Sequence, residues 1–239
     1  LAAQTHRMIG HRSPACSDLF ARIQPRLRRV FQTEHRVLIA ASSGSGLQEA
    51  ALRNTVRERV LVCVGGAFAE RWYEIAVANG LEADRLDVPW GRPHDPDQVA
   101  EAVRRRSYDA VAVVHNESST GVENPIAEIA AAVRQVSPDT LILVDAVSSA
   151  AGVDLRPDAW GVDVLLTSSQ KCLALPPGLA FAAVSDRTLE RAQTIPQRGW
   201  YFDFVLLDRH LKQNNTPTTP AISLLFALDA QLDRILAEG

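Results

Sequence analysis

Hydrophobic and polar positions form two patterns that alternate along this chain. Short apolar runs rich in β-branched residues predict buried strands at residues 37–41, 59–64, 110–115, 140–147, 162–168 and 179–184. Apolar residues at helical spacing predict helices at residues 46–56, 68–79, 96–106 and 125–136. This alternation predicts an α/β fold, with a mostly parallel mixed sheet and helices on both of its faces.

Length and composition limit the possible functions. At 239 residues, with 46% of them hydrophobic, the chain can fill the core of one large domain or two small ones. The net charge of −3 argues against nucleic acid or an anionic membrane surface as the main partner, because both favour a basic face. No apolar run reaches the ~18 to 20 residues of a membrane-spanning helix. We therefore expect neither nucleic acid nor a membrane as a partner.

The cysteines and histidines lack the spacing of metal ligands. Cys16, Cys63 and Cys172 form no CxxC or Cys/His pattern, and the six histidines are scattered. This usage predicts no metal site and a reduced, cytoplasmic setting. We interpret Cys172 as a small core residue rather than a reactive thiol.

Two chemically informative residues follow apolar runs. Lys171 comes after the run at 162–168, so its amine is expected at a strand end beside a cleft, where partial desolvation favours the neutral, nucleophilic form. Asp145 belongs to the run at 140–147, and parallel strands would bring both groups to one edge. Pyridoxal phosphate requires such a pair, because a lysine holds its aldehyde and a carboxylate keeps its pyridine nitrogen protonated. Either residue alone also fits a surface lysine or a turn-capping aspartate.

A turn of glycine and serine is a candidate phosphate site. Ser43, Gly44 and Ser45 lie between the first predicted strand and the helix at 46–56. Free N–H groups, hydroxyls and the positive end of a helix dipole favour an anion there. The turn matches neither a Walker loop nor GxGxxG, so nucleotide motifs do not fit, although an ordinary helix N-cap would look the same.

Two further strand ends carry useful side chains. Phe68 follows a pair of glycines at the start of a predicted helix, where its ring could lie on a flat cofactor or belong to the core. Ser118 lies in a polar stretch at residues 116–122 and supplies a hydroxyl. The phosphate turn, the carboxylate and the amine also lie at predicted strand ends. The joint occurrence of all these groups is far less likely by chance than that of any one of them.

Taken together, four stretches resemble the class V aminotransferases of fold type I. They are residues 43–51, 117–122, 144–149 and 168–179, of which the run SSQKCLALPPGL at 168–179 is the most specific. The opening residues 8–12 also resemble the branch of alanine:glyoxylate, serine:pyruvate and serine:glyoxylate enzymes. The resemblance extends to about residue 230.

The resemblance implies a role for each matching residue. Lys171 would form the internal aldimine, a Schiff base, and shuttle the proton during transamination, while Asp145 pairs with the pyridine nitrogen and Phe68 stacks on the ring. Thr218 would reach across a homodimer interface to the neighbour's phosphate. The other cofactor-binding residues that the resemblance implies are Ser43, Gly44, Ser45, Ser118, Val147 and Gln170.

The resemblance also implies a domain organisation. It predicts the remnant of an N-terminal arm at 1–20 and a pyridoxal-phosphate-binding large domain at 21–239, with an extended active-site or interface loop at 198–222. The C-terminal small domain, which carries an arginine for the substrate carboxylate in this family, is expected to be largely absent. We therefore expect cofactor binding by a homodimer, with weak or no turnover by this chain.

The predicted reaction moves an amino group from alanine or serine to glyoxylate or pyruvate. Cysteine desulfurases and their relatives have histidine before the lysine, so Gln170 favours transamination. Two alternatives remain open. One is another fold type I activity, such as a lyase, and the other is a non-catalytic module, either a nucleotide-binding α/β domain or a truncated paralogue.

Overall fold

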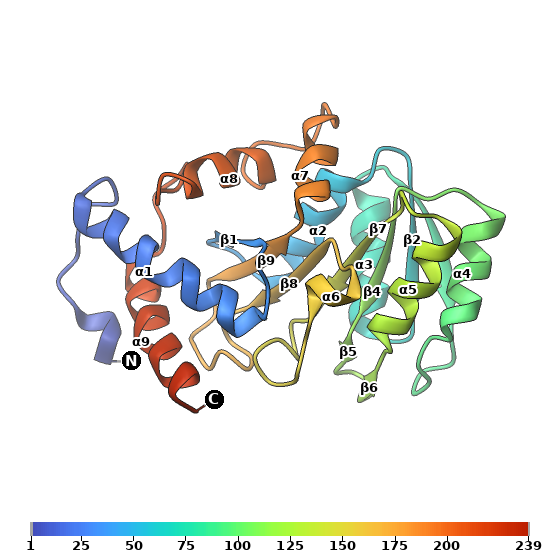
Figure 1. Cartoon of the computed structure of the whole chain (residues 1–239), viewed down its shortest axis with the longest axis horizontal. Helices are drawn as coiled ribbons and strands as arrows, with labels where there is room; N and C mark the ends of the chain where they lie inside the picture. Colours follow the sequence, from blue (N-terminus) through green and yellow to red (C-terminus); the bar gives the residue numbers. More distant parts are fainter. Residues whose placement is uncertain (1, 239) are drawn as a thin grey trace.

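Seven strands form the central sheet within residues 2–238, the part of the chain that this computed structural model describes (Figure 1). In spatial order they are β1 (Arg36–Ala40), β9 (Ala180–Val184), β8 (Val164–Ser168), β7 (Leu141–Asp145), β4 (Ala110–Val114), β2 (Arg59–Val64) and β3 (Glu82–Asp87). Only β9 runs antiparallel to its neighbours, and the other pairs are parallel. The predicted fold class, an α/β structure with a mostly parallel mixed sheet, is confirmed.

Helices cover both faces of the sheet. Figure 1 shows α4 and α5 on the near face, with α2 and α3 behind the strands. The helices are α1 (Pro14–Phe31), α2 (Gly44–Thr55), α3 (Ala67–Ala78), α4 (Pro96–Arg105), α5 (Ile126–Val136), α6 (Pro157–Trp160), α7 (Asp186–Gln193), α8 (Phe204–Leu211) and α9 (Ile222–Glu238), with a short 3-10 helix, η1 (Ala2–Thr5). A small hairpin of β5 (Asn116–Glu117) and β6 (Val122–Glu123) follows β4. Within residues 2–238, no helix has the length and apolar character needed to cross a bilayer.

The central strands are buried from end to end, which explains their continuous apolar runs. Every residue of β4, β7 and β8 is buried. A parallel strand between two helical layers has no side that faces solvent, so most of its residues are apolar. The edge strand β3 was not predicted because it is only partly buried, and Glu82, Asp84 and Arg85 interrupt its apolar pattern. Charged side chains at a sheet edge also discourage pairing with another chain.

One helix lies where the sequence predicted an extended loop, and another spans a predicted domain boundary. The segment 198–222, expected to be an extended loop, contains α8, whose first turn is capped by Asp203 Oδ1 accepting from Val205 N at 2.9 Å and Leu206 N at 3.2 Å. Phe204, the first residue of this short helix, is fully buried and anchors the helix to the core. Near the N-terminus, α1 passes through the predicted boundary at residue 20 and packs against α9. The first and last residues, 1 and 239, lie outside the described range.

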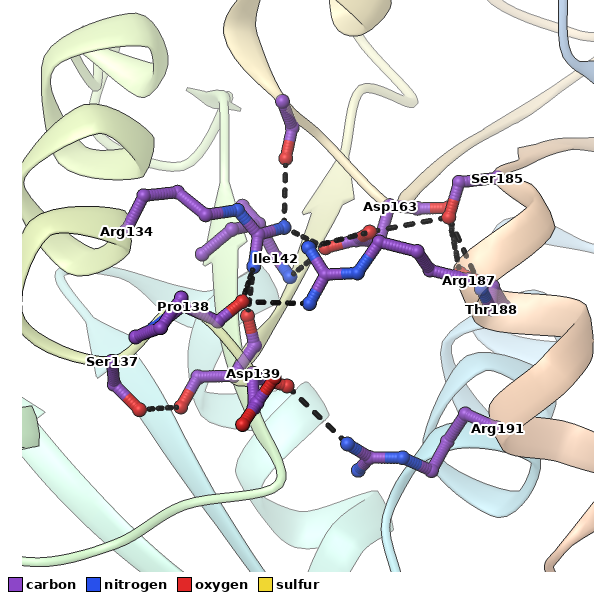
Figure 2. A network of polar contacts seen from close by, with 12 residues as sticks. Arg134, Ser137, Pro138, Asp139, Ile142, Asp163, Ser185, Arg187, Thr188 and Arg191 are labelled. Atoms are coloured by element: carbon purple, nitrogen blue, oxygen red, sulfur yellow. Dashed lines mark hydrogen bonds and ion pairs between the residues drawn. The ribbon is translucent and has the colours of Figure 1, made fainter.

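A buried aspartate fixes the amino end of β8. Asp163 accepts a hydrogen bond from Ile142 N on β7 at 2.8 Å and from Ser185 Oγ at 3.1 Å. It also forms ion pairs with Arg134 of α5 and, at 3.9 Å, with Arg187 of α7. Figure 2 shows these side chains converging on Asp163. The network therefore links α5 and α7, which lie on opposite faces of the sheet, to the amino-terminal ends of the parallel strands.

Candidate active site

A cavity of about 220 Å³ opens at the carboxyl ends of the parallel strands. Ligands of open α/β sheets bind at this edge, because the loops that follow the strands converge there. Eight of the ten residues predicted to bind a cofactor line the cavity: Ser43, Gly44, Ser45, Phe68, Asp145, Val147, Gln170 and Lys171. The structure thus brings together side chains from the ends of β1, β2, β7 and β8.

The remaining two predicted residues do not line this cavity. Ser118 lies beside it, since its hydroxyl is hydrogen-bonded to that of Ser148, which does line the cavity. Thr218 lines a separate, smaller hollow together with apolar residues such as Phe20 and Tyr201. In this single chain, Thr218 is therefore not part of the cavity.

The first turn of α2 forms one end of the cavity. Ser43 is the N-cap residue, and its side chain accepts a hydrogen bond from Gly46 N at 3.4 Å. Gly44 approaches the loop after β7 so closely that a Cβ atom there would lie 2.6 Å from Val147 Cγ2. Beside it, Ser168 Oγ is buried and has no hydrogen-bond partner among the described residues. A buried hydroxyl without a partner, next to free helix N–H groups, fits an anion such as phosphate.

Asp145 forms the polar floor of the cavity. Its Oδ1 accepts a hydrogen bond from Val147 N at 2.8 Å, and its Oδ2 accepts one from Gln48 Nε2 at 2.6 Å. Burial raises the pKa of this carboxyl to about 6, and the two hydrogen bonds oppose that rise. Each oxygen retains acceptor capacity, so the carboxylate can receive one more N–H donor from the cavity.

Phe68 forms one wall of the cavity, and two cationic side chains lie close to its ring. Lys171 Nζ lies 6.0 Å from the centroid of the Phe68 ring, and Arg71 Cζ lies 5.2 Å from it. The predicted partial desolvation of Lys171 is wrong for this structure, because the residue lies beyond the end of β8 in an exposed turn. The core position predicted for Cys172 is also wrong, since this residue shares the exposed turn.

Sequence reasoning missed several cavity residues. Gln48 lies one helical turn after Gly44, and Arg71 lies one turn after Phe68, so helical spacing from the predicted residues could have indicated both. No such signal marks Ser168, the last residue of a buried strand. Asn116 and Ser148 also line the cavity.

The histidine, cysteine and acidic side chains do not suggest a metal centre. Within residues 2–238, no three or more of them are grouped so as to hold a metal ion. The groups that do converge are an amine, a buried carboxylate, an aromatic ring and a helix N-terminus with hydroxyls. They suit a flat, anionic organic molecule with a ring nitrogen and a carbonyl group.

Comparison with known proteins identifies a family and several relatives of this chain. Residues 1–238 match the family profile described as "Aminotransferase class-V". The chain is 39% identical, over 97% of its length, to a Synechococcus sp. protein named soluble hydrogenase, small subunit, of which it covers 61%. It is 34% identical, over 97% of its length, to the L-aspartate–glyoxylate aminotransferase of Paracoccus denitrificans, of which it covers 60%.

Solved structures extend the comparison to the fold. An alanine–glyoxylate aminotransferase from Nostoc sp. superposes with a TM-score of 0.93 at 32% identity, over 100% of this chain and 64% of that one. The chain spans about three fifths of the length of the two curated relatives. The family profile, however, extends over nearly all of this chain. The chain therefore belongs to the class V aminotransferase family.

Proposed function

We propose that this chain is the pyridoxal-phosphate-binding part of an aminotransferase that acts on a small amino acid and a 2-oxo acid. One observation carries the proposal: Lys171, Asp145 and Phe68 converge with the first turn of α2 around a single cavity. The amine would bind the aldehyde of this cofactor, and the buried carboxylate would bind its ring nitrogen. The aromatic side chain would stack on the face of its ring.

The two ends of the cavity fit the two ends of pyridoxal phosphate. At the phosphate end, Ser43, Gly44 and Ser45 would supply helix N–H groups and hydroxyls, and the unpartnered Ser168 Oγ would gain a hydrogen bond. At the ring end, Asp145 would accept the N–H of the protonated pyridine. With a pKa near 6, this carboxyl is mostly ionised at neutral pH and can hold that proton in place.

When bound, pyridoxal phosphate supplies an electron sink for the substrate Cα. Lys171 would hold the cofactor at its aldehyde carbon through Nζ, and the same amine would carry the proton that leaves the substrate Cα. Gln170 and Ser118, which lie at and beside the cavity, would bind the polar edges of the cofactor.

Glyoxylate is the acceptor that the comparisons favour. The Paracoccus denitrificans and Nostoc sp. proteins are both named for glyoxylate, whereas their names give aspartate and alanine as donors. We propose alanine or serine as the donor and glyoxylate or pyruvate as the acceptor, as the sequence resemblance implies. A donor panel of alanine, serine and aspartate would distinguish the candidates.

We also propose that the chain works as a homodimer in the cytoplasm. Thr218 lies outside the cavity of its own subunit, which suits a residue that completes the site of a neighbour. The free cysteines Cys16, Cys63 and Cys172 suit a reducing compartment.

The test is covalent labelling of the chain. This chain contains two lysines, Lys171 and Lys212, so peptide mapping can tell which of the two side chains carries an adduct. Incubation with pyridoxal phosphate should give a yellow protein, and borohydride reduction followed by peptide mapping should place the label on Lys171. Lys212→Arg should label as the wild type does, whereas Lys171→Arg should not.

Two outcomes would count against the proposal. Absence of label on Lys171 would defeat the cofactor assignment. A colourless protein that binds a nucleotide would favour the non-catalytic α/β module instead.

A further inference from the structure

The buried carboxylate of Glu117 holds the start of helix α3. Glu117 is 2% exposed, and its Oε2 accepts hydrogen bonds from Phe68 N at 3.2 Å and Ala69 N at 3.1 Å. Its Oε1 accepts from Ser119 N at 3.2 Å and from Ser119 Oγ at 2.6 Å. Both carboxylate oxygens are thus engaged by N–H or hydroxyl donors.

Helix α3 takes its cap from another part of the chain. Its N-cap residue, Gly66, provides no side-chain cap, and the hydroxyl of Ser119 accepts from Ala67 N at 3.0 Å. A Cβ atom at Gly66 would lie 2.6 Å from both Glu117 Cδ and Ser119 Oγ. The side chains of the β5–β6 hairpin therefore occupy the space that a local capping residue would use.

This arrangement ties Phe68 to the strand that carries Asp145. Glu117 follows shortly after β4, whose last residue, Val114, pairs with Asp145 of β7. The N–H of Phe68 is held by Glu117, and the ring of Phe68 forms the cavity wall. The carboxylate also lies at the positive end of the α3 dipole, where a negative charge is stabilising.

We infer that Glu117 is a positioning residue, which places the ring of Phe68 as the stacking surface for the pyridine ring of the cofactor. The inference rests on the proposed function, because a stacking surface requires the cofactor to occupy this cavity. It goes beyond that function in assigning a cofactor-site role to a residue that does not line the cavity. A purely structural cap would affect stability alone, whereas a positioning residue also affects cofactor affinity per folded molecule.

The first experiment compares Glu117→Gln with Glu128→Gln, which removes an exposed carboxylate on α5. Glutamine keeps the shape and one acceptor oxygen, but it loses the charge and presents an NH2 group to N–H donors. Dissociation constants for pyridoxal phosphate should rise about tenfold in Glu117→Gln, as loss of a charge-assisted hydrogen bond implies. Glu128→Gln should bind as the wild type does. The circular dichroism of the bound cofactor should also weaken in Glu117→Gln, since that signal reports how the ring is seated.

A double-mutant cycle shows whether Glu117 acts through Phe68. Phe68→Leu removes the aromatic face while keeping an apolar side chain at the start of α3. In the Phe68→Leu background, Glu117→Gln should change the cofactor dissociation constant by less than about twofold, because residues that act as a unit are not additive. Fully additive effects would overturn the inference.

If Glu117→Gln does not fold, Ser119→Ala tests the same contact. It removes the hydroxyl that joins Glu117 to Ala67 N but leaves the carboxylate in place. Cofactor binding should weaken about threefold, again only while Phe68 is present. Unchanged affinity would overturn the inference.

The two proposals fail in different ways. Labelling of Lys171 in the wild type, with unchanged cofactor affinity in Glu117→Gln, overturns the role of Glu117 and leaves the cofactor assignment standing. Absence of labelling in the wild type removes both.

Discussion

The side-chain amide of Gln48 donates a hydrogen bond of 2.6 Å to Oδ2 of Asp145. Gln48 lies on α2, the helix whose first turn forms the proposed phosphate end of the site. Its backbone oxygen accepts a hydrogen bond from Trp72 Nε1 of α3 at 3.1 Å, which holds this turn of α2 in place. One helix therefore contacts both ends of the cavity, through its first turn and through Gln48.

Gln48→Leu should raise the pKa of Asp145 above its present value of about 6, because it removes a donor that stabilises the carboxylate. Pyridoxal phosphate affinity at about pH 7 should fall roughly three- to tenfold and recover toward wild type at higher pH, where Asp145 is again ionised. Cofactor titrations at several pH values would measure this. Gln197→Leu, at an exposed surface glutamine, is the matched control. A loss of affinity that does not depend on pH would contradict the explanation.

Asp145→Asn should stabilise the cofactor-free protein and impair cofactor binding. Burial raises the pKa of Asp145 from 3.8 to about 6, so ionisation opposes folding by about 3 kcal/mol at neutral pH. Because the folded-state pKa is the higher one, this penalty grows as pH rises from 3.8 through 6, and it is largely absent below 3.8. The rotated amide of Gln48 could accept the new Asn N–H through Oε1, which has no partner among the described residues.

Urea unfolding of wild type and Asp145→Asn would measure this difference. The variant should be more stable near neutral pH, and its advantage should shrink to less than about 1 kcal/mol at about pH 4. If the wild type and the variant were equally stable at both pH values, the buried, ionised carboxylate of Asp145 would not destabilise the fold.

Ser168→Ala should separate phosphate binding from ring binding. The hydroxyl of Ser168 is buried without a partner, so its removal should leave the cofactor-free protein as stable as before or about 1 kcal/mol more stable. Affinity for pyridoxal phosphate should fall about fivefold, whereas affinity for pyridoxal, which lacks the phosphate, should not change. Equal losses for both ligands would place the hydroxyl away from the phosphate.

Asp163→Ala should destabilise the fold without affecting the cavity. The substitution leaves the buried Ile142 N–H without its side-chain acceptor and the half-buried Arg134 guanidinium without its ion-pair partner, at a cost of about 2 to 3 kcal/mol. Asp186→Ala, which removes a neighbouring exposed ion pair with Arg36, should cost less than about 1 kcal/mol. Chemical unfolding would compare the two variants. Cofactor affinity per folded molecule should equal that of the wild type in both, because Asp163 lies at the opposite edge of the sheet.

The sequence by itself predicted the buried strands and the side chains that follow them. Continuous apolar runs mark strands covered on both faces, and parallel strands end at a common edge. For this reason Lys171, Asp145 and the turn at Ser43 could be expected at one site before the structure was known. The family resemblance added roles for these residues, which the labelling and affinity experiments address.

Only the tertiary structure decided the partners of these side chains. Gln48 meets Asp145, and Glu117 caps the helix that carries Phe68, because the strand order brings distant segments together. Local periodicity reports which face of an element is buried, but it does not report which element becomes its neighbour. The charged edge strand β3, the short helix α8 and the exposure of Lys171 likewise depend on position in the finished fold rather than on any local pattern.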